Sequence, residues 1–460
     1  MTTTRRNLLK TLAASAAAPF IFPARAWAAG EKRSIGCVGM GKQMRGLMNG
    51  FMSRGVQVLG VCDPDTTRRT DAQAKADKYY TDNPSKGSKG TIAYNDYREL
   101  IARKDIDLIC IATPDHWHAR IIIEAVKASK DVYCEKPLTH DIQESIDVMK
   151  AVEENKRVLQ TGSMQRSSKE FRIACELVQN GVIGKIERVE CSFGDPFRPC
   201  DLPEEKAEPG LDWNLWLGPA PVRPYNAILS PRGIHDNFPN WRSYEEYGGG
   251  GVADWGAHHL DIAQWGLGMD NSGPVEVLPP EKTGDKRGAV LKYASGVSVI
   301  HKDGYGVHFY GADGEVLVNR GKFKLIVKGE TIADHTPPPP PPKDKKDAPA
   351  KDAKAAKETA KTSLDAELKK AEEAFLKNAK IKLYVSKSHH DDFLECVASR
   401  KKPITSEITG SRSAICCHLL NLAYKYGKPM KWDPEKNAFA AGTGDPKWLT
   451  LDTRDPFKKG

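Results

Sequence analysis

Long apolar runs, C-x-x-C cysteine pairs and stripes of mixed basic and aromatic residues are all missing from this 460-residue sequence. The apolar run at Leu12–Phe22 is shorter than the roughly 20 residues that cross a bilayer, which excludes a multi-span membrane protein. Without cysteine pairs, we expect buried small side chains and no disulfide framework. Without a basic and aromatic stripe, a nucleic-acid partner is not expected.

Charge is distributed unevenly along the chain. The net charge is +9, of which four positive charges lie in the first 28 residues, where there is no acid, and three come from residues 343–380. The remainder is close to neutral. With 40% hydrophobic and 28% charged residues, the sequence is typical of a soluble globular protein with two or three domains.

The first 28 residues are typical of an export signal. Arg5, Arg6 and Lys10 precede the apolar run, and residues 26–28 (AWA) offer a small-residue site, so we expect cleavage after Ala28. The adjacent arginines favour the twin-arginine route over an ordinary export signal, which is the alternative. That route exports proteins already folded, often with a cofactor inside. The sequence therefore predicts a periplasmic or otherwise exported protein whose mature form has no membrane segment.

A glycine-rich turn follows the first predicted strand, at residues 34–38. Gly39 and Gly41 open a predicted helix, and the next predicted strand ends in Asp63. Glycines let the backbone approach a pyrophosphate at a helix N-terminus, and a carboxylate about 20 residues on binds the ribose hydroxyls and disfavours a 2′-phosphate. This order predicts an NAD-binding βαβ unit, although Met44 stands where the third glycine of the motif falls.

Short apolar strands then alternate with helices. Strands at 107–112 and 131–134 flank a helix at 119–129, and a further helix covers 141–155. This alternation predicts a parallel sheet with helices on both faces and ligands beyond the carboxyl ends of its strands. The expected cofactor-binding residues are Gly39, Gly41, Lys42, Gln43, Asp63, Thr113, Pro114, His116, His118, Glu135 and Lys136.

Three motifs in this order carry a family resemblance: the glycine turn with its acid-ended strand, the Thr-Pro…His loop at 113–118, and Glu-Lys-Pro at 135–137. With the later stretch GGGGVADWGAHHLD at 248–261, the chain resembles the glucose–fructose oxidoreductase / inositol dehydrogenase (Gfo/Idh/MocA) family over most of residues 34–330. The resemblance implies an N-terminal Rossmann domain, doubly wound around a parallel sheet, and a C-terminal α/β domain. The second domain is expected to have an open, largely antiparallel sheet and to support a homo-oligomer, a dimer or tetramer.

The resemblance transfers three catalytic residues, Lys136, Asp254 and His258. Asp254 and His258 are four residues apart, so on a continuous helix both project from one face. Oxidation of a secondary alcohol needs a hydride acceptor and a base, and a neutral imidazole with an ordinary pKa of roughly 6.5 suits the base. Asp254 is expected to bind the substrate hydroxyl or orient the imidazole. Lys136 is expected to polarise the forming carbonyl.

Loops rich in aromatic and polar residues suit a carbohydrate, because sugars present apolar C–H faces and many hydroxyls. We expect Arg166, Trp213 and Trp241 to bind the substrate, while core packing is an equal alternative for the tryptophans. His259 faces another side of its helix and is expected to pack. The run at 389–392 (HHDD) fits a helix start and lacks metal-ligand spacing, so no metal site is predicted.

The expected domains are a signal peptide at 1–28, an NAD-binding domain at 29–156 and a substrate and oligomerisation domain at 157–460. Within the last, residues 336–380 contain six consecutive prolines followed by a run rich in Lys, Ala, Asp and Glu. Such a segment is stiff and holds few apolar residues, so an exposed insertion is predicted. Apolar residues return at helical spacing between 391 and 425, which predicts two helices that close the second domain.

Three functions fit these features. The first is an exported NAD-dependent oxidoreductase whose partner is a small carbohydrate: a sugar, polyol or sugar derivative. The second is a redox-neutral glycoside hydrolase that uses NAD in oxidation, elimination, hydration and reduction. The third is a non-catalytic NAD- or sugar-binding protein, which the presence of Lys136 and His258 disfavours. Because there is no obvious NAD pool outside the cytoplasm, the export signal favours a cofactor that stays bound and a net redox-neutral cycle.

Overall fold

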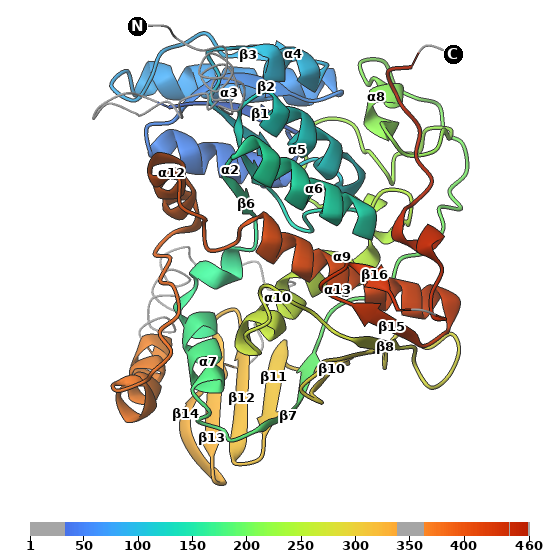
Figure 1. Ribbon diagram of the computed structural model, residues 1–460. Coiled ribbons are helices and arrows are strands. Elements are labelled where there is room, and N and C mark those ends of the chain that lie inside the picture. Colours follow the sequence, from blue (N-terminus) through green and yellow to red (C-terminus); the bar gives the residue numbers. More distant parts are fainter. Residues whose placement is uncertain (1–32, 338–362, 441, 459–460) are drawn as a thin grey trace, which may run out of the picture. The chain divides into compact units, whose positions relative to one another are not determined.

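Six short strands form the first sheet, and their side chains are mostly buried because helices cover both sides. All neighbouring pairs are parallel, in the order β3-β2-β1-β4-β5-β6 (Figure 1). The computed structural model describes residues 33–337, 363–440 and 442–458. The strands are β1 (Ser34–Val38), β2 (Gln57–Cys62), β3 (Ile92–Tyr94), β4 (Leu108–Ile111), β5 (Asp131–Cys134) and β6 (Leu159–Thr161).

Two groups of helices pack on the first sheet. α2 (Lys42–Ser53) and α3 (Thr66–Asp82) contribute to one apolar core, and α4 (Tyr97–Ala102), α5 (His118–Lys127) and α6 (Ile142–Asn155) contribute to another. The sheet lies between these two cores. This arrangement confirms the predicted doubly wound Rossmann fold.

Two features of the domain organisation differ from the sequence prediction. β6 completes the first sheet, so the first domain continues past residue 156. α12 (His389–Ser399), which we expected in the second domain, contributes Phe393, Cys396 and Val397 to the core of the first. Its apolar periodicity predicts a helix correctly, but an apolar face does not specify which domain it covers.

A ten-stranded sheet forms the second domain. Within the described residues β7 and β10 pair in parallel, and the other neighbouring strands pair antiparallel, as the fold class predicts. α7 (Lys169–Gln179), α10 (Gly256–Gly266) and α13 (Glu407–Tyr426) pack on it. The strands are β7 (Ile186–Cys191), β8 (Glu276–Leu278), β9 (Val290–Lys292), β10 (Ser298–His301), β11 (Val307–Gly311), β12 (Gly314–Asn319), β13 (Lys322–Val327), β14 (Glu330–His335), β15 (Met430–Asp433) and β16 (Ala438–Phe439).

The end of the expected insertion belongs to the core of the second domain. Residues 363–371 are helical and continue into η4 (Glu372–Leu376), and Leu364, Leu368 and Ala371 are buried there. The prediction that 336–380 is exposed throughout is therefore wrong for this part. Its few apolar residues recur at helical spacing, so they form one stripe that packs.

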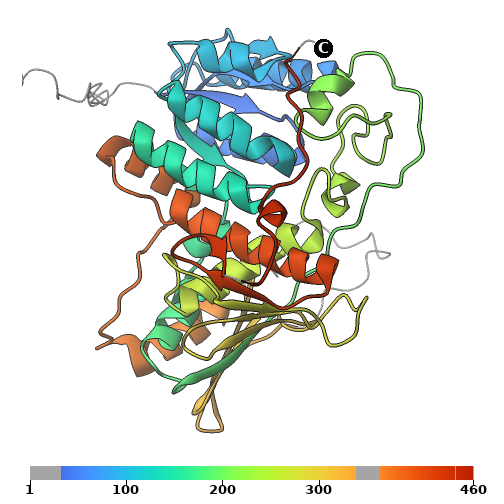
Figure 2. The ribbon, with the colours of Figure 1, turned by 45° about the vertical axis from the view of Figure 1, so that its right-hand side comes forward.

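α13 joins the two domains. It packs on α6 of the first and on α10 of the second, and Figure 2 shows it crossing between the two sheets. The chain then returns to the first domain, where Phe457 packs on the core. No helix in the described part of the chain is long and apolar enough to span a membrane. The predicted signal peptide, 1–28, lies outside the described residues.

Candidate active site

The glycine turn between β1 and α2 approaches the neighbouring strand closely. Gly39 has a φ of +87°, and a Cβ there would lie 2.8 Å from the carbonyl oxygen of Ala112, so the position requires glycine. At Gly41 a Cβ would meet no atom within 4 Å, which leaves space in front of α2. Met44, at the third glycine position of the motif, is buried in the core that α2 forms with the sheet.

Asp63 follows β2 and lines, with Gly39 and Gly41, a cavity here called the nucleotide pocket. Its carboxylate accepts hydrogen bonds from the main-chain N–H groups of Met40 and Asp65, each 2.8 Å long. Burial raises the pKa of Asp63 above its ordinary value, and Arg68 partly offsets that effect. The carboxylate is therefore fixed beside the glycine turn. In Rossmann domains an acid at this position accepts hydrogen bonds from the ribose hydroxyls of the dinucleotide.

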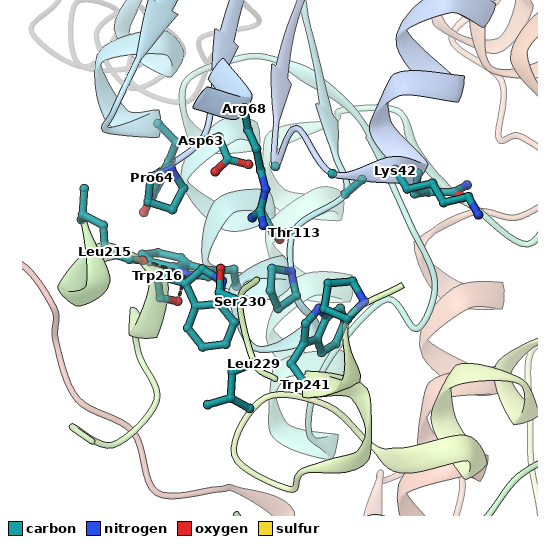
Figure 3. A pocket seen from close by; sticks show the side chains of 18 of the residues that line it. Lys42, Asp63, Pro64, Arg68, Thr113, Leu215, Trp216, Leu229, Ser230 and Trp241 are labelled. Atoms are coloured by element: carbon teal, nitrogen blue, oxygen red, sulfur yellow. Dashed lines mark hydrogen bonds between the residues drawn. The ribbon is translucent and has the colours of Figure 1, made fainter. Parts of the chain in front are cut away.

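Residues 228–242, here called the covering segment, form the opposite wall of this nucleotide pocket. Figure 3 shows Leu229 and Trp241 on the side of the pocket opposite Asp63 and Arg68. The covering segment belongs to the second domain as the sequence divides it, so the nucleotide pocket is completed by both halves of the chain.

Basic side chains of the first domain hold the covering segment in place. Arg45 donates to the His235 carbonyl at 2.8 Å and to the Asp236 carboxylate at 2.7 Å, and Lys42 donates to the Asp236 carbonyl. Arg68 donates to the carbonyls of residues 231 and 233. These contacts tie the segment to the first turns of α2 and α3, which flank the space left for a nucleotide.

The polar lining of the nucleotide pocket fits NAD. The Oγ1 of Thr113 is buried without a hydrogen-bond partner among the described residues, and Thr113 lines both this pocket and the cavity beside it. Lys42, Gln43 and Pro114 also line the nucleotide pocket. An open helix start, a fixed carboxylate and an unpaired hydroxyl are the groups that a pyrophosphate, a ribose and a nicotinamide need.

Three other expected cofactor residues have different surroundings. The ring nitrogens of His118 lie 2.8 Å from the Pro137 oxygen and 3.1 Å from the Thr113 oxygen, so this histidine links the two loops at the strand ends. Glu135 accepts a 2.9 Å hydrogen bond from Gln43. His116 is packed against Trp216 and Tyr247 and lines neither the nucleotide pocket nor the cavity beside it, which corrects its predicted role.

A second cavity of about 510 Å³, here called the reaction pocket, adjoins the nucleotide pocket. Lys136, Asp254 and His258 all line it. Lys136 follows β5, Asp254 ends α9 (Gly250–Asp254), and His258 lies in the first turn of α10. Trp255 separates these two helices, so the continuous helix that the sequence predicts is interrupted between the two residues.

Lys136 and Asp254 form an ion pair at the floor of the reaction pocket. The Nζ of Lys136 lies 2.6 Å from the Asp254 carboxylate and 2.7 Å from the Asp254 carbonyl oxygen. The Arg242 guanidinium is 3.6 Å from the same carboxylate. Burial by itself would raise the pKa of Asp254, but these two cations outweigh it and lower the pKa. Asp254 therefore positions Lys136, and no hydrogen bond among the described residues joins it to His258.

His258 is held neutral. Burial lowers the pKa of its imidazole well below 6.5, and the positive charges of Lys136 and Arg320 lower it further. Its Nδ1 is buried without a hydrogen-bond partner among the described residues. A neutral imidazole beside a cation retains a lone pair at neutral pH, which is the state that a general base needs.

Two of the three expected substrate residues lie elsewhere. Arg166 is buried and pairs with Asp261 at 2.8 Å and with Asp270 at 2.7 Å. Trp213 stacks on Trp216 and donates its indole N–H to a carbonyl, so it packs within the second domain and lines neither pocket. Trp241 lines both pockets. The composition of these loops fits both core packing and substrate binding. Only the fold shows which residue does which.

Replacing Arg166 by methionine is expected to lower the free energy of unfolding by about 3–5 kcal/mol, because it leaves two carboxylates of a buried cluster without their cation. Urea unfolding measures this loss. The control is Arg188→Met, which removes a partly exposed pair with Glu190 and is expected to cost about 1 kcal/mol or less. Equal losses in the two variants would contradict a structural role for Arg166.

Among the lining residues of the reaction pocket that were not expected from the sequence are Arg242, Trp255 and Arg320. The guanidinium of Arg320 lies 4.8 Å from the Trp255 ring and donates to Gln165 at 3.0 Å. Trp255, between α9 and α10, is 44% exposed. Arg320 comes from the turn between β12 and β13, far along the chain from every motif, so no local pattern could have placed it here.

Two family models match the chain, one on each domain. The model described as an oxidoreductase family with an NAD-binding Rossmann fold matches residues 33–163. The model described as the C-terminal alpha/beta domain of an oxidoreductase family matches residues 197–320. The matches cover the glycine turn, the Glu-Lys-Pro motif and the helices that carry Asp254 and His258.

Named relatives match about a third of the chain. Inositol 2-dehydrogenase of Salmonella typhimurium (strain LT2) is 33% identical over 153 residues, 33% of this chain and 41% of that protein. Glycosyl hydrolase family 109 protein 2 of Shewanella sp. (strain ANA-3) is 28% identical over 160 residues, 35% of this chain and 34% of that protein. The chain thus spans well under half the length of these relatives.

Solved structures share the fold over nearly the whole chain. The aldose-aldose oxidoreductase of Caulobacter crescentus, complexed with glycerol, matches with a TM-score of 0.54 and 17% identity, covering 87% of this chain and 100% of that one. The WlbA dehydrogenase of Bordetella pertussis, in complex with NADH and UDP-GlcNAcA, matches with a TM-score of 0.57 and 16% identity, covering 88% and 99%. At these identities the likeness shows the fold alone.

Proposed function

The chain belongs to the Gfo/Idh/MocA oxidoreductase family, and from this premise we propose that it is an NAD-dependent oxidoreductase acting on a CH–OH group of a sugar, polyol or sugar derivative. The observation that carries the proposal is that Lys136, Asp254 and His258 line one cavity, and that this cavity shares Gln43 and Thr113 with the nucleotide pocket. The cavity that holds these three groups therefore adjoins the nucleotide pocket.

The roles of the three residues follow from their charge states. When bound, NAD supplies the hydride acceptor. The neutral imidazole of His258 takes the proton of the substrate hydroxyl, and the Lys136 ammonium stabilises the negative charge that develops on that oxygen. Asp254 holds the ammonium in place through its 2.6 Å contact. Trp241 and Trp255 offer aromatic surface to the C–H faces of a sugar ring.

The alternative is a redox-neutral glycoside hydrolase with the same three residues. The Shewanella relative is named a glycosyl hydrolase, and the Caulobacter structure is named an aldose–aldose oxidoreductase. Screening aryl glycosides and free sugars for released product, while following NADH absorbance, separates the two. Release of the aryl group supports the hydrolase, and an oxidised product formed from a free sugar or polyol supports the oxidoreductase.

We expect the reaction to run without net consumption of NAD. An exported enzyme has no obvious pool with which to reoxidise a released cofactor, so the electrons taken from one substrate must return to that substrate or to a second sugar. The measurement is turnover with substoichiometric NAD and no added oxidant. Many turnovers without net NADH are expected, whereas free NADH that accumulates only while NAD is supplied would identify an ordinary dehydrogenase.

The covering segment is expected to retain the cofactor. Arg68→Ala removes hydrogen bonds that hold the segment over the nucleotide pocket, so NADH should dissociate roughly tenfold faster. Stopped-flow fluorescence of bound NADH measures this rate. Lys75→Ala, an exposed change on the same helix, is the control and should leave the rate unchanged. An unchanged rate in Arg68→Ala would show that the segment does not limit release.

The export proposal rests on residues 1–28, and the proposed oligomer, a dimer or tetramer, rests on the family resemblance. Both are directly testable. Replacement of Arg5 and Arg6 by lysine is expected to retain the protein in the cytoplasm, as cell fractionation would show, and light scattering gives the oligomeric state. Protein purified from the exported compartment is expected to release NAD(H), and not NADP(H), on denaturation, because Asp63 disfavours a 2′-phosphate.

A further inference from the structure

A third cavity, of about 530 Å³, shares no lining residue with the nucleotide pocket or the reaction pocket. It lies where the first turn of α6, the end of α13 and the C-terminal tail (residues 442–458) meet. Asp141 and Glu144 line it from α6, Asn421 from α13, and Trp448 from the tail. The tail is fixed there, because the N–H of Leu451 donates to Asp141 at 3.0 Å.

Two residues that line this cavity each have a buried acceptor atom without a partner among the described residues: Nε2 of His140 and Oδ1 of Asn421. The two residues are only 9% and 2% exposed. Burial lowers the pKa of His140 well below its usual value, and the ring bonds to the main chain of Glu245. The free nitrogen of a neutral ring that donates through its other nitrogen is an acceptor. Asn421 already donates its amide to the Gly249 oxygen at 2.8 Å, which leaves its oxygen as an acceptor.

The two carboxyl groups from α6 lack a neutralising cation within ion-pair distance among the described residues. The Glu144 carboxyl accepts the main-chain N–H of His140 at 2.7 Å, and the Asp141 carboxyl accepts the main-chain N–H of Glu144 at 2.7 Å. Burial raises the pKa of Asp141 to about 6, and burial together with the charge of Asp141 raises the pKa of Glu144 well above its usual value. Of the lysines that line the cavity, Lys425 pairs with Glu245, and Lys447 is exposed.

An aromatic pair completes the wall. Trp448 stacks on Tyr426 with ring centroids 4.0 Å apart and planes within 10°. A flat aromatic face next to uncompensated carboxyl groups attracts a cation and packs on the C–H face of a sugar ring. The cavity therefore offers two buried acceptors, two carboxyl groups without a cation and an aromatic surface.

We propose that this cavity binds the primary ammonium group of a small hydroxylated amine, of which an amino sugar is the simplest form. An ammonium group brings three donors and one positive charge. It would pair with Asp141 and Glu144, while hydroxyl groups of the same ligand donate to His140 and Asn421. The site is independent of the oxidoreductase reaction, because no catalytic residue lines it.

Calorimetric titration of the full chain with glucosamine tests the proposal. We expect saturable binding of glucosamine and none of glucose or N-acetylglucosamine, which lack the charge. Glu144→Gln is expected to weaken binding roughly tenfold or more, since it removes a charged acceptor without changing side-chain size. Asp141→Asn should do the same, because asparagine caps α6 as well as aspartate does. Glu153→Gln, an exposed change on the same helix, is the control.

The outcomes separate the possibilities. Equal binding of glucose would overturn the proposal, as would glucosamine binding that neither Glu144→Gln nor Asp141→Asn weakens. Tighter binding of putrescine than of glucosamine would support the ammonium site and assign it to alkyl amines. Retention of glucosamine binding in His258→Ala is expected, and it shows that the amine does not occupy the reaction pocket.

Discussion

Replacing His258 by alanine is expected to lower kcat by about 10²–10⁴-fold, which is the typical contribution of a positioned general base. The imidazole lines the reaction pocket, and burial and the charge of Lys136 keep it neutral. No other histidine of the pocket replaces it, because both ring nitrogens of His118 face carbonyl oxygens. The rate is measured on the substrate that the sugar screen identifies, and NADH binding is measured in parallel.

His259→Ala is the matched control for this prediction. His259 is the next residue of α10, is equally buried and contacts the same Trp255 ring, but it bonds to the Ser192 carbonyl and does not line the reaction pocket. We expect it to lose stability and to keep kcat within a few-fold. Near-normal turnover in His258→Ala, or an equal loss in both variants, contradicts the assignment of His258 as the base.

Replacing Lys136 by methionine is expected to lower kcat by about 10²–10³-fold, the usual loss when one group that stabilises a developing oxyanion is removed. A second effect identifies its electrostatic role. The Lys136 charge helps to lower the pKa of His258, so its removal raises that pKa. The base is active when deprotonated. The acid limb of the kcat profile should therefore lie well below pH 6.5 in the unaltered enzyme and move to higher pH in Lys136→Met.

Lys136→Arg separates charge from position. It keeps a cation near His258, so the acid limb should return toward that of the unaltered enzyme, while kcat remains reduced because a guanidinium cannot reproduce the 2.6 Å contact of Nζ with Asp254. If the acid limb does not move in Lys136→Met, the residue does not tune the base. A normal kcat in Lys136→Met would contradict a catalytic role for Lys136.

The glycine turn, the parallel sheet of the first domain and the grouping of Lys136 with Asp254 and His258 could be predicted from sequence. The first two depend on short-range constraints. Gly39 must adopt a positive φ, and three- to six-residue strands alternate with amphipathic helices. The catalytic group followed from a family pattern, which joins distant positions that spacing alone does not connect.

The partners of charged side chains could not be predicted. Arg166 and Arg320 both lie in polar stretches of the sequence, yet one is buried between Asp261 and Asp270 and the other lines the reaction pocket. The domain on which α12 packs could not be predicted either. Its apolar face covers the core of the first domain. In each case the deciding neighbour lies far away along the chain.

The sequence by itself determined the chemistry that is available: a nucleotide turn, an acid that favours NAD, and a lysine, a carboxylate and an imidazole for alcohol oxidation. The tertiary structure alone decided which of these groups share a cavity and in what charge state. It decided the contact between Lys136 and Asp254, the neutral state of His258 and the position of the covering segment over the nucleotide pocket. The physical reason is that local patterns fix backbone conformation, whereas burial and Coulomb interactions depend on distances that only the folded chain defines.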